Sequence, residues 1–147
     1  MSNSDLTQLE ADKLIKIPKY HQDEQKRYSY PNEGEITIPL LSRDEREKFL
    51  LDVWKGKIGL KSKYQTRGRK VVVLIRLDLH GAPHRNPDGE EVAGTHIHLY
   101  REGYGDKWAY PVDSEKFTNL DDLWQTLHDF MNFCNIQKIP IIDRGLF

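Results

Sequence analysis

Histidine is concentrated in one part of this 147-residue chain, because four of its six histidines lie between residues 80 and 98. These four are His80, His84, His96 and His98. Imidazole changes charge near neutral pH, so it can accept or donate a proton, and its neutral form binds metal ions. A single histidine is often structural, whereas four in one short segment indicate a shared chemical role. Whether they act together depends on the strands that carry them.

The segment around these histidines has the pattern of two strands joined by a loop. An apolar, β-branched run leads into it, and residues 95–101 alternate between polar and apolar. Side chains alternate faces along a strand, so an antiparallel pairing can place Asp78 opposite His96. Arg76 then lies opposite His98 in the same register. One face is expected to hold six of the side chains, with three more on the loop above it: Arg76, Asp78, His80, His96, His98 and Tyr100, then His84, Asn86 and Asp88.

This expected face contains the groups needed to cleave RNA without a metal. One group removes the proton of the 2′-hydroxyl, another protonates the leaving oxygen, and a cation stabilises the charge on the phosphoryl oxygens. His96 and His98 can serve as base and acid, and Arg76 can bind the phosphate. Asp78 would orient an imidazole. The candidate catalytic residues are His96, His98, Arg76 and Asp78, with His84 and Tyr100 in support.

A metal site is the second interpretation of the same residues. Two histidines separated by one strand residue have Cβ atoms about 6.5 to 7 Å apart and can chelate one ion. His96 and His98, together with Glu102, could hold zinc, manganese or iron. In a third interpretation the histidines satisfy buried polar partners or lie on a hydrated surface. The residues alone leave these three alternatives open.

A basic segment precedes the histidines. No acidic residue lies between Asp52 and Asp78, whereas lysine and arginine recur there. Residues 58–65 have the alternation of a strand, which would place lysines on one exposed face and further cations at the following turn. The candidate nucleic-acid-binding residues are Lys57, Lys61, Lys63, Arg67, Arg69 and Lys70. A row of cations suits a phosphate backbone, although lysines on an edge strand also prevent aggregation.

Composition and length are typical of a soluble protein with one domain. The formal net charge is -1, so no overall excess of charge favours nucleic acid or a membrane. The one cysteine, Cys134, excludes an internal disulfide and suits the reducing cytoplasm. Neither a secretory signal nor an apolar run long enough to span a membrane is present. We therefore expect a cytoplasmic protein without membrane contact.

The order of the predicted elements indicates an α+β fold. Residues 1–35 are expected to form an N-terminal helix and a polar arm, and residues 36–112 an antiparallel meander. Residues 113–147 would add a C-terminal helix with a broad apolar stripe, followed by an apolar tail. The expected single domain is an antiparallel β-sheet with both helices packed on one face.

Two stretches around the histidines resemble known bacterial proteins. The signature RLDLHGAPHRNPDG, followed by THIHLYREGYGDKWAYP, is similar to a family of small uncharacterised bacterial and prophage proteins. A looser resemblance is to TumE-like toxins of toxin–antitoxin pairs, which carry R-x-D, then P-H, then a closely spaced histidine pair. The positions that match this pattern are Arg76, Asp78, Pro83, His84, His96 and His98. This second resemblance implies toxin activity and a protein partner such as an antitoxin.

The leading hypothesis is a metal-independent endoribonuclease-type toxin, or a related nuclease, that acts on RNA and needs no cofactor. One alternative is a non-enzymatic phage or prophage accessory protein that binds and inhibits a host nucleoprotein complex. Another is an enzyme that uses His96 and His98 to hold a divalent metal ion. Loss of these histidines should abolish the activity of either enzyme but not that of the binder.

Overall fold

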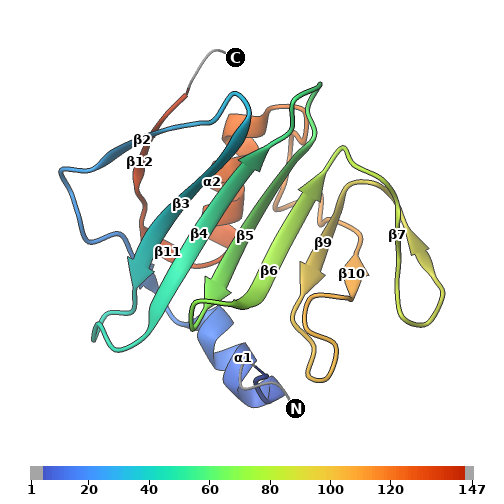
Figure 1. The fold of residues 1–147 in the computed structure, drawn as a ribbon, viewed down its shortest axis with the longest axis horizontal. Helices are drawn as coiled ribbons and strands as arrows, with labels where there is room; N and C mark the ends of the chain where they lie inside the picture. The colour runs from blue at the N-terminus through green and yellow to red at the C-terminus, as the bar shows by residue number, and fades with distance from the viewer. Residues whose placement is uncertain (1–4, 145–147) are drawn as a thin grey trace.

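The structure, a computed structural model, describes residues 5–144, and its centre is one eight-stranded sheet (Figure 1). In spatial order the strands are β10 (Ala109–Tyr110), β9 (His96–Leu99), β6 (Val72–Leu79), β5 (Ser62–Gly68), β4 (Lys48–Lys55), β3 (Gly34–Leu41), β1 (Lys19–Tyr20) and β11 (Ile136–Lys138). Neighbouring strands are antiparallel except β1 and β11, which are parallel. Two smaller pairs flank the sheet, namely β2 (Arg27–Ser29) with β12 (Ile141–Asp143) and β7 (His84–Arg85) with β8 (Glu91–Val92). The predicted α+β class is confirmed.

Two helices accompany the sheet, as the sequence predicted. α1 (Gln8–Lys16) begins with a capping box, in which Thr7 and Glu10 satisfy each other's backbone N–H groups. α2 (Leu123–Phe133) begins after Asp122, whose carboxylate accepts a backbone N–H of the first turn. In Figure 1 α2 lies behind the sheet, and α1 lies at its lower end. Among the described residues no helix is both long and apolar enough to cross a membrane.

One face of the sheet is buried against α2 and forms the core. Alternate residues of the central strands point to it, among them Leu51, Tyr64 and Leu77, which have no exposed surface. Burying each such side chain stabilises the fold by roughly 1.5 to 3 kcal/mol. Tyr64 also donates a hydrogen bond to the carbonyl oxygen of Leu123, 3.0 Å away, and so joins sheet and helix. A shift of one residue would expose this whole set, so burial fixes the register of the strands.

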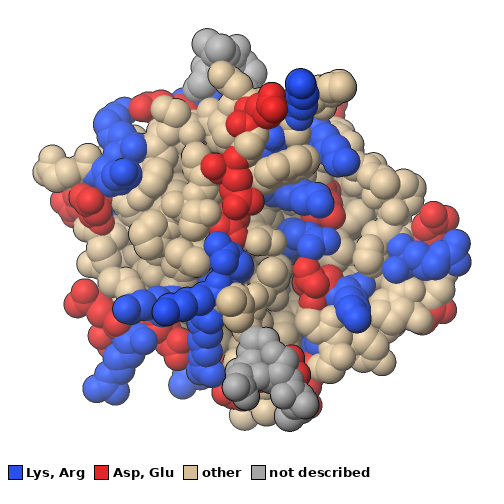
Figure 2. All heavy atoms as spheres, in the orientation of Figure 1, with Lys and Arg blue, Asp and Glu red and all other residues tan. Residues whose placement is uncertain are grey.

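The opposite face of the sheet is open and faces the viewer in Figure 1. Across the part of the chain that the structure describes, neither helix lies over this face. It carries the polar residues of the alternating strands, such as Lys63 and Gln65 of β5. Figure 2 shows basic and acidic side chains interspersed over it. A molecule that approaches the sheet therefore meets this open face.

The strand predicted over residues 58–65 begins later than expected. Gly56 and Lys61 close a turn with a backbone hydrogen bond of 2.8 Å, and Ile58 between them is 83% exposed. The start of this segment is therefore a turn that exposes an apolar residue, and not a strand. β5 begins only at Ser62.

Candidate histidine centre

β6 and β9 pair in the register predicted from the sequence. Asp78 lies opposite His96, and Arg76 lies opposite His98. The side chains of all four residues project from the open face, because the intervening Leu77 points into the core. His96 Nε2 lies 3.2 Å from Asp78 Oδ2, and His98 Nε2 lies 3.4 Å from the same oxygen. The predicted shared face of these two strands is confirmed.

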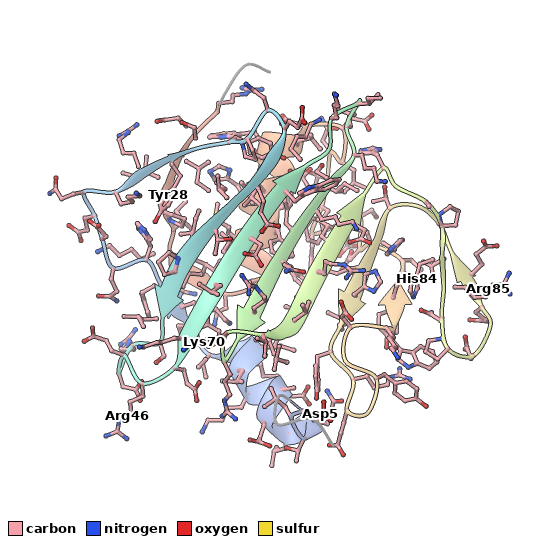
Figure 3. All side chains as sticks on the ribbon, viewed as in Figure 1. Asp5, Tyr28, Arg46, Lys70, His84 and Arg85 are labelled. Atoms are coloured by element: carbon pink, nitrogen blue, oxygen red, sulfur yellow. The ribbon has the colours of Figure 1, made fainter. Side chains whose placement is uncertain are left out.

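A third imidazole, that of His84, joins this group from the β7–β8 hairpin. Its ring centre lies 4.7 Å from that of His98 and 5.6 Å from that of His96. Figure 3 labels His84 beside β9, on the side of the hairpin. One ring nitrogen from each of the three histidines lies within 4.8 Å of the others. Five residues make up this histidine centre: Arg76, Asp78, His84, His96 and His98.

Asn86 holds the β7–β8 hairpin against the edge of the sheet. Its side-chain Nδ2 donates to the carbonyl oxygen of Ala109 at 2.9 Å, and its Oδ1 accepts from the Ala109 N–H at 2.8 Å. The Asn86 side chain thus bonds both backbone groups of Ala109, as a neighbouring strand would. Gly89, with φ +90°, permits the tight turn between the two strands of this hairpin. His84, two residues before Asn86, is thereby held over His98.

Each imidazole of the centre is oriented by a backbone carbonyl oxygen. The three bonds run from His84 Nε2 to Lys107 (2.8 Å), from His96 Nδ1 to Ala93 (2.6 Å) and from His98 Nδ1 to Asp106 (2.7 Å). A carbonyl oxygen can only accept, so these ring nitrogens carry the hydrogen and donate it. In a neutral ring the second nitrogen then carries a lone pair and can only accept a hydrogen bond. Two of the three carbonyls belong to the loop after β9, which therefore helps to build the centre.

Arg76 connects the carboxylates and imidazoles of the centre. Its Nε donates to Asp78 Oδ1 at 2.9 Å, and its Nη1 donates to Asp106 Oδ2 at 2.7 Å. Its Nη2 donates to His98 Nε2 at 3.0 Å. Burial alone would raise the pKa of Asp78, but the contact with His98 and the charge of Arg76 hold that pKa well below its usual value. Asp78 is therefore an anion at neutral pH.

The centre is mostly closed to solvent, but not equally at every residue. His96 and His98 are 2% and 1% exposed. The side chains of Arg76 and Asp78 keep 22% and 13% of their surface exposed, and His84 is half-buried. A large molecule therefore meets the edge formed by Arg76 and His84. The nitrogens of His96 and His98 lie behind this edge, where a water molecule or a small ion can reach them.

Tyr100 does not belong to this face, contrary to the prediction. β9 ends at Leu99, so the alternation of the strand no longer applies at the next residue. Tyr100 is 6% exposed, and its hydroxyl bonds both backbone groups of Leu6, accepting from N at 2.8 Å and donating to O at 2.7 Å. In this structure Tyr100 anchors the segment that precedes α1.

His80 and Glu102 also lie outside the centre. β6 ends one residue before His80, which has φ +54° and turns away, so that its Nε2 donates to the carbonyl oxygen of Leu120 at 2.9 Å. Glu102 accepts the backbone N–H of Gln8 at the start of α1, at 2.6 Å. The structure therefore does not bring Glu102 to the paired histidines of β9. His84 is the third group that lies near them.

The predicted nucleic-acid-binding residues do not form one continuous row. Lys57 and Lys61 precede β5, whereas Arg69 and Lys70 lie in the turn after it, where both have positive φ. Regular alternation is limited to the strand between these turns. Lys63 is therefore the predicted lysine that lies on the open strand face.

Acidic partners neutralise two of the predicted arginines. Arg67 Nε lies 2.6 Å from Asp52 Oδ2, and Arg69 contacts Glu10 at 3.2 Å and Glu47 at 3.4 Å. A cation already paired with a carboxylate attracts a phosphate less strongly. The free basic surface is therefore smaller than the sequence indicated.

Lys63 lies directly beside the histidine centre. The strand register pairs it with Asp78 of β6 on one side and with Trp54 of β4 on the other. A cross-strand row therefore runs from Trp54 through Lys63 and Asp78 to His96. The Lys63 ammonium lies 5.7 Å from the centre of a Trp54 ring. Sequence reasoning missed Trp54, because its place beside the centre depends on the pairing of three strands.

Comparison with known proteins identifies a family without an assigned function. Residues 6–136 match a family described as a family of unknown function (DUF6978). No curated protein and no solved structure matches the chain. The resemblance to TumE-like toxins gains no support from these comparisons. Since the match covers most of the chain, this protein belongs to the family of unknown function DUF6978.

Proposed function

We propose that this protein cleaves phosphodiester bonds of RNA at the histidine centre. The proposal rests on one observation, the convergence of three imidazoles, a guanidinium and a carboxylate on the open face of the sheet. Apolar burial on the opposite face accounts for the fold, and it requires no titratable groups here. Clusters of interacting titratable groups that reach a protein surface are frequent at functional sites.

The histidine centre contains groups suited to each part of this reaction. A base must remove the 2′-hydroxyl proton, an acid must protonate the leaving 5′-oxygen, and a cation must stabilise the phosphoryl oxygens. Arg76 supplies the cation at the exposed edge. His96 and His98 are the proposed proton-transfer groups, and because they are buried they exchange protons with the substrate through a water molecule bound beside them. Asp78 keeps Arg76 and the two imidazoles in place.

Trp54 and Lys63 give a path along which an RNA strand would reach the centre. An unpaired base stacked on an aromatic ring contributes about 1 to 3 kcal/mol to binding. Lys63 would contact a phosphate, and it lies between Trp54 and Asp78 in the cross-strand row. Stacking needs a base outside a duplex, so the proposed substrate is single-stranded RNA.

Cleavage of labelled single-stranded RNA by the purified protein tests this proposal. Replacing His98 or His84 by Ala should lower the rate by about 10²- to 10⁴-fold, because a proton-transfer or supporting group is lost. His80→Ala is the matched control, because His80 lies in the same segment but outside the centre. Circular dichroism shows whether each variant is folded. An inactive wild-type protein, or a full rate in both folded variants, would refute the proposal.

A second candidate function is binding of a host protein without catalysis. A groove of about 1130 Å³ along β3 and β4 favours it. Apolar side chains such as Tyr28, Ile36 and Leu50 line this groove together with the cations Lys48 and Lys70. A binder that uses the groove should keep its effect on the host when the histidines are replaced. Growth of cells that express His98→Ala therefore separates the two functions.

A further inference from the structure

The second ring nitrogens of the three histidines form a group of acceptors. His84 Nε2, His96 Nδ1 and His98 Nδ1 donate to backbone carbonyls, so the lone pairs of the neutral rings are those on His84 Nδ1, His96 Nε2 and His98 Nε2. Of these, His98 Nε2 accepts a hydrogen bond from Arg76. A hydrogen bond from one ring nitrogen to a carbonyl is the arrangement that orients metal-binding histidines, because it fixes both the tautomer and the ring plane. All three rings of the centre have it.

Asp78 adds another acceptor to the same small space. Its Oδ2 lies 3.2 Å from His96 Nε2 and 3.4 Å from His98 Nε2. A lone pair that faces a carboxylate at this distance is repelled unless a proton or a cation lies between the two atoms. Arg76 Nη2 donates to His98 Nε2 at 3.0 Å and to Asp78 Oδ2 at 3.4 Å, so the repulsion that is left is between His96 Nε2 and Asp78 Oδ2. A cation held by the three rings would remove the remaining repulsion.

We infer that His84, His96 and His98 bind one divalent metal ion of the zinc class, with Asp78 beside it. One nitrogen from each ring lies within 4.8 Å of the others. Three nitrogens around tetrahedral zinc are about 3.4 Å apart, so the rings must approach one another by up to roughly 1.4 Å. His84 can supply most of this movement, since its hairpin lies outside the main sheet. Three histidines leave a fourth position for a water molecule.

The donor set determines which ions suit this site. Imidazole nitrogens favour zinc and neighbouring ions such as cobalt and nickel, whereas magnesium and calcium prefer oxygen ligands. Arg76 competes with the ion, because its guanidinium contacts the His98 nitrogen that the ion would use. Arg76 can leave that nitrogen and remain bound to Asp78 and Asp106.

The metal site deepens the proposed function, because the ion would be the cofactor of the cleavage centre. Its use in cleavage rests on that proposal, but its binding does not. With the ion on their ring nitrogens, His96 and His98 would hold it in place, and water bound to it, whose pKa the ion would lower, would supply the proton transfer instead of these rings. Binding is measurable on the protein alone, without RNA.

Isothermal titration calorimetry of chelator-treated protein with zinc tests the inference. Wild-type protein should bind one zinc ion, and His84→Ala should bind it at least about tenfold more weakly, since a ligand is lost. His84 lies on a half-buried hairpin, so this variant should stay folded, which circular dichroism checks. His80→Ala should bind zinc as wild type does. Cobalt in place of zinc should give the visible absorption of a tetrahedral site, and His84→Ala should lose it.

Two results would overturn the inference: folded wild-type protein that binds no zinc, or equal zinc affinities in wild type and His84→Ala. The two proposals also fail separately. Zinc binding without RNA cleavage contradicts the proposed function alone, whereas RNA cleavage that persists in excess chelator contradicts the metal cofactor alone.

Discussion

Asp52 and Asp78 lie on the same open face, two strands apart, and each is a mostly buried carboxylate beside an arginine. Their partners differ in kind. Every contact of Asp52 comes from a donor, namely Thr37 Oγ1 (2.7 Å), Gln65 Nε2 (2.8 Å), Arg67 Nε (2.6 Å) and Arg67 Nη2 (2.9 Å). Asp78 receives donors from Arg76 but also faces ring nitrogens that act as acceptors in neutral histidine.

A buried charge by itself therefore says little about function. The Asp52 network is complete, so its charge is compensated and its contribution is to stability. The Asp78 group is incomplete unless a proton or an ion is added. An excess of acceptors in a partly open position is therefore the feature that marks the histidine centre as functional.

The largest expected difference is between substitutions of Arg76 and Arg67, in the rate of RNA cleavage. Arg76→Ala should lower the rate of RNA cleavage by about 10²-fold or more, because the cation beside the reacting phosphate is lost. Arg67→Ala should leave the rate per folded molecule unchanged, since Arg67 serves Asp52. Initial rates, divided by the folded fraction from circular dichroism, measure both. Equal losses in the two variants would remove the functional distinction between the two regions.

Stability should show the opposite order. Arg67→Ala leaves Asp52 buried without its cation, which should cost about 3 kcal/mol in the free energy of unfolding. Arg76→Ala should cost less, because the side chain of Asp78 is 13% exposed against 3% for Asp52, so water can replace the lost donor more easily. Urea unfolding of the two variants measures these costs. A larger loss for Arg76→Ala would indicate that the histidine centre is mainly structural.

Zinc affinity offers a prediction in which a substitution strengthens binding. Arg76→Gln removes a positive charge and frees His98 Nε2 for the ion. Zinc should therefore bind this variant about tenfold more tightly than it binds wild type. Two like charges a few ångströms apart repel by at least the free energy that corresponds to a tenfold change in affinity. Calorimetric titration of the two proteins measures the change. Weaker binding by Arg76→Gln would mean that Arg76 supports the metal site instead of competing with it.

Acid should weaken both carboxylate networks. Burial by itself would raise the pKa of Asp52, but hydrogen bonds from Arg67, Gln65 and Thr37 lower it, and the pKa of Asp78 is lowered as well. A carboxylate with a lowered pKa stabilises the fold fully above its ordinary pKa of 3.8, and that stability is lost as the pH falls further.

The difference in melting temperature between wild type and Asp52→Asn should therefore shrink below pH 3.8. Thermal melts at several pH values measure it. A difference that stays constant into acid would mean that the Asp52 charge contributes nothing to stability.

The smallest expected effect concerns RNA binding. Lys63→Ala should reduce the salt dependence of RNA binding by about 0.7 in the log–log slope, because one phosphate contact is lost. Lys57 lies in the turn before β5, so Lys57→Ala is the matched control and should leave the slope unchanged. A filter-binding salt series measures both slopes. Equal slopes for wild type and Lys63→Ala would remove Lys63 from the proposed RNA path.

Much of the fold and the core of the site could be predicted from the sequence. The alternation of apolar residues such as Leu77 and Ile97 fixes which residues of β6 and β9 face the core. The opposite parity then places Asp78 with His96 and Arg76 with His98. The alternation of apolar residues therefore predicts which residues of neighbouring strands meet, but only over the length of those strands.

The errors in prediction occur where a strand ends, and with it the alternation of its side chains. Tyr100 and His80 each follow the last residue of a strand, and alternation no longer describes where their side chains point. The place of His84 depends on the docking of a hairpin through Asn86, which is a contact between distant segments. The carbonyl groups that orient the imidazoles have no sequence signal, because every residue has one.

The most direct test of the central claim compares the rates at which Asp78→Asn and Asp52→Asn cleave single-stranded RNA. Both substitutions remove a charge with little change in shape, and each rate is divided by the folded fraction. Asp78→Asn should lose at least about 10²-fold in rate, because the imidazoles and Arg76 lose the group that holds them. Asp52→Asn should keep the wild-type rate per folded molecule. Equal rates for the two folded variants would contradict the claim that the histidine centre is the functional region.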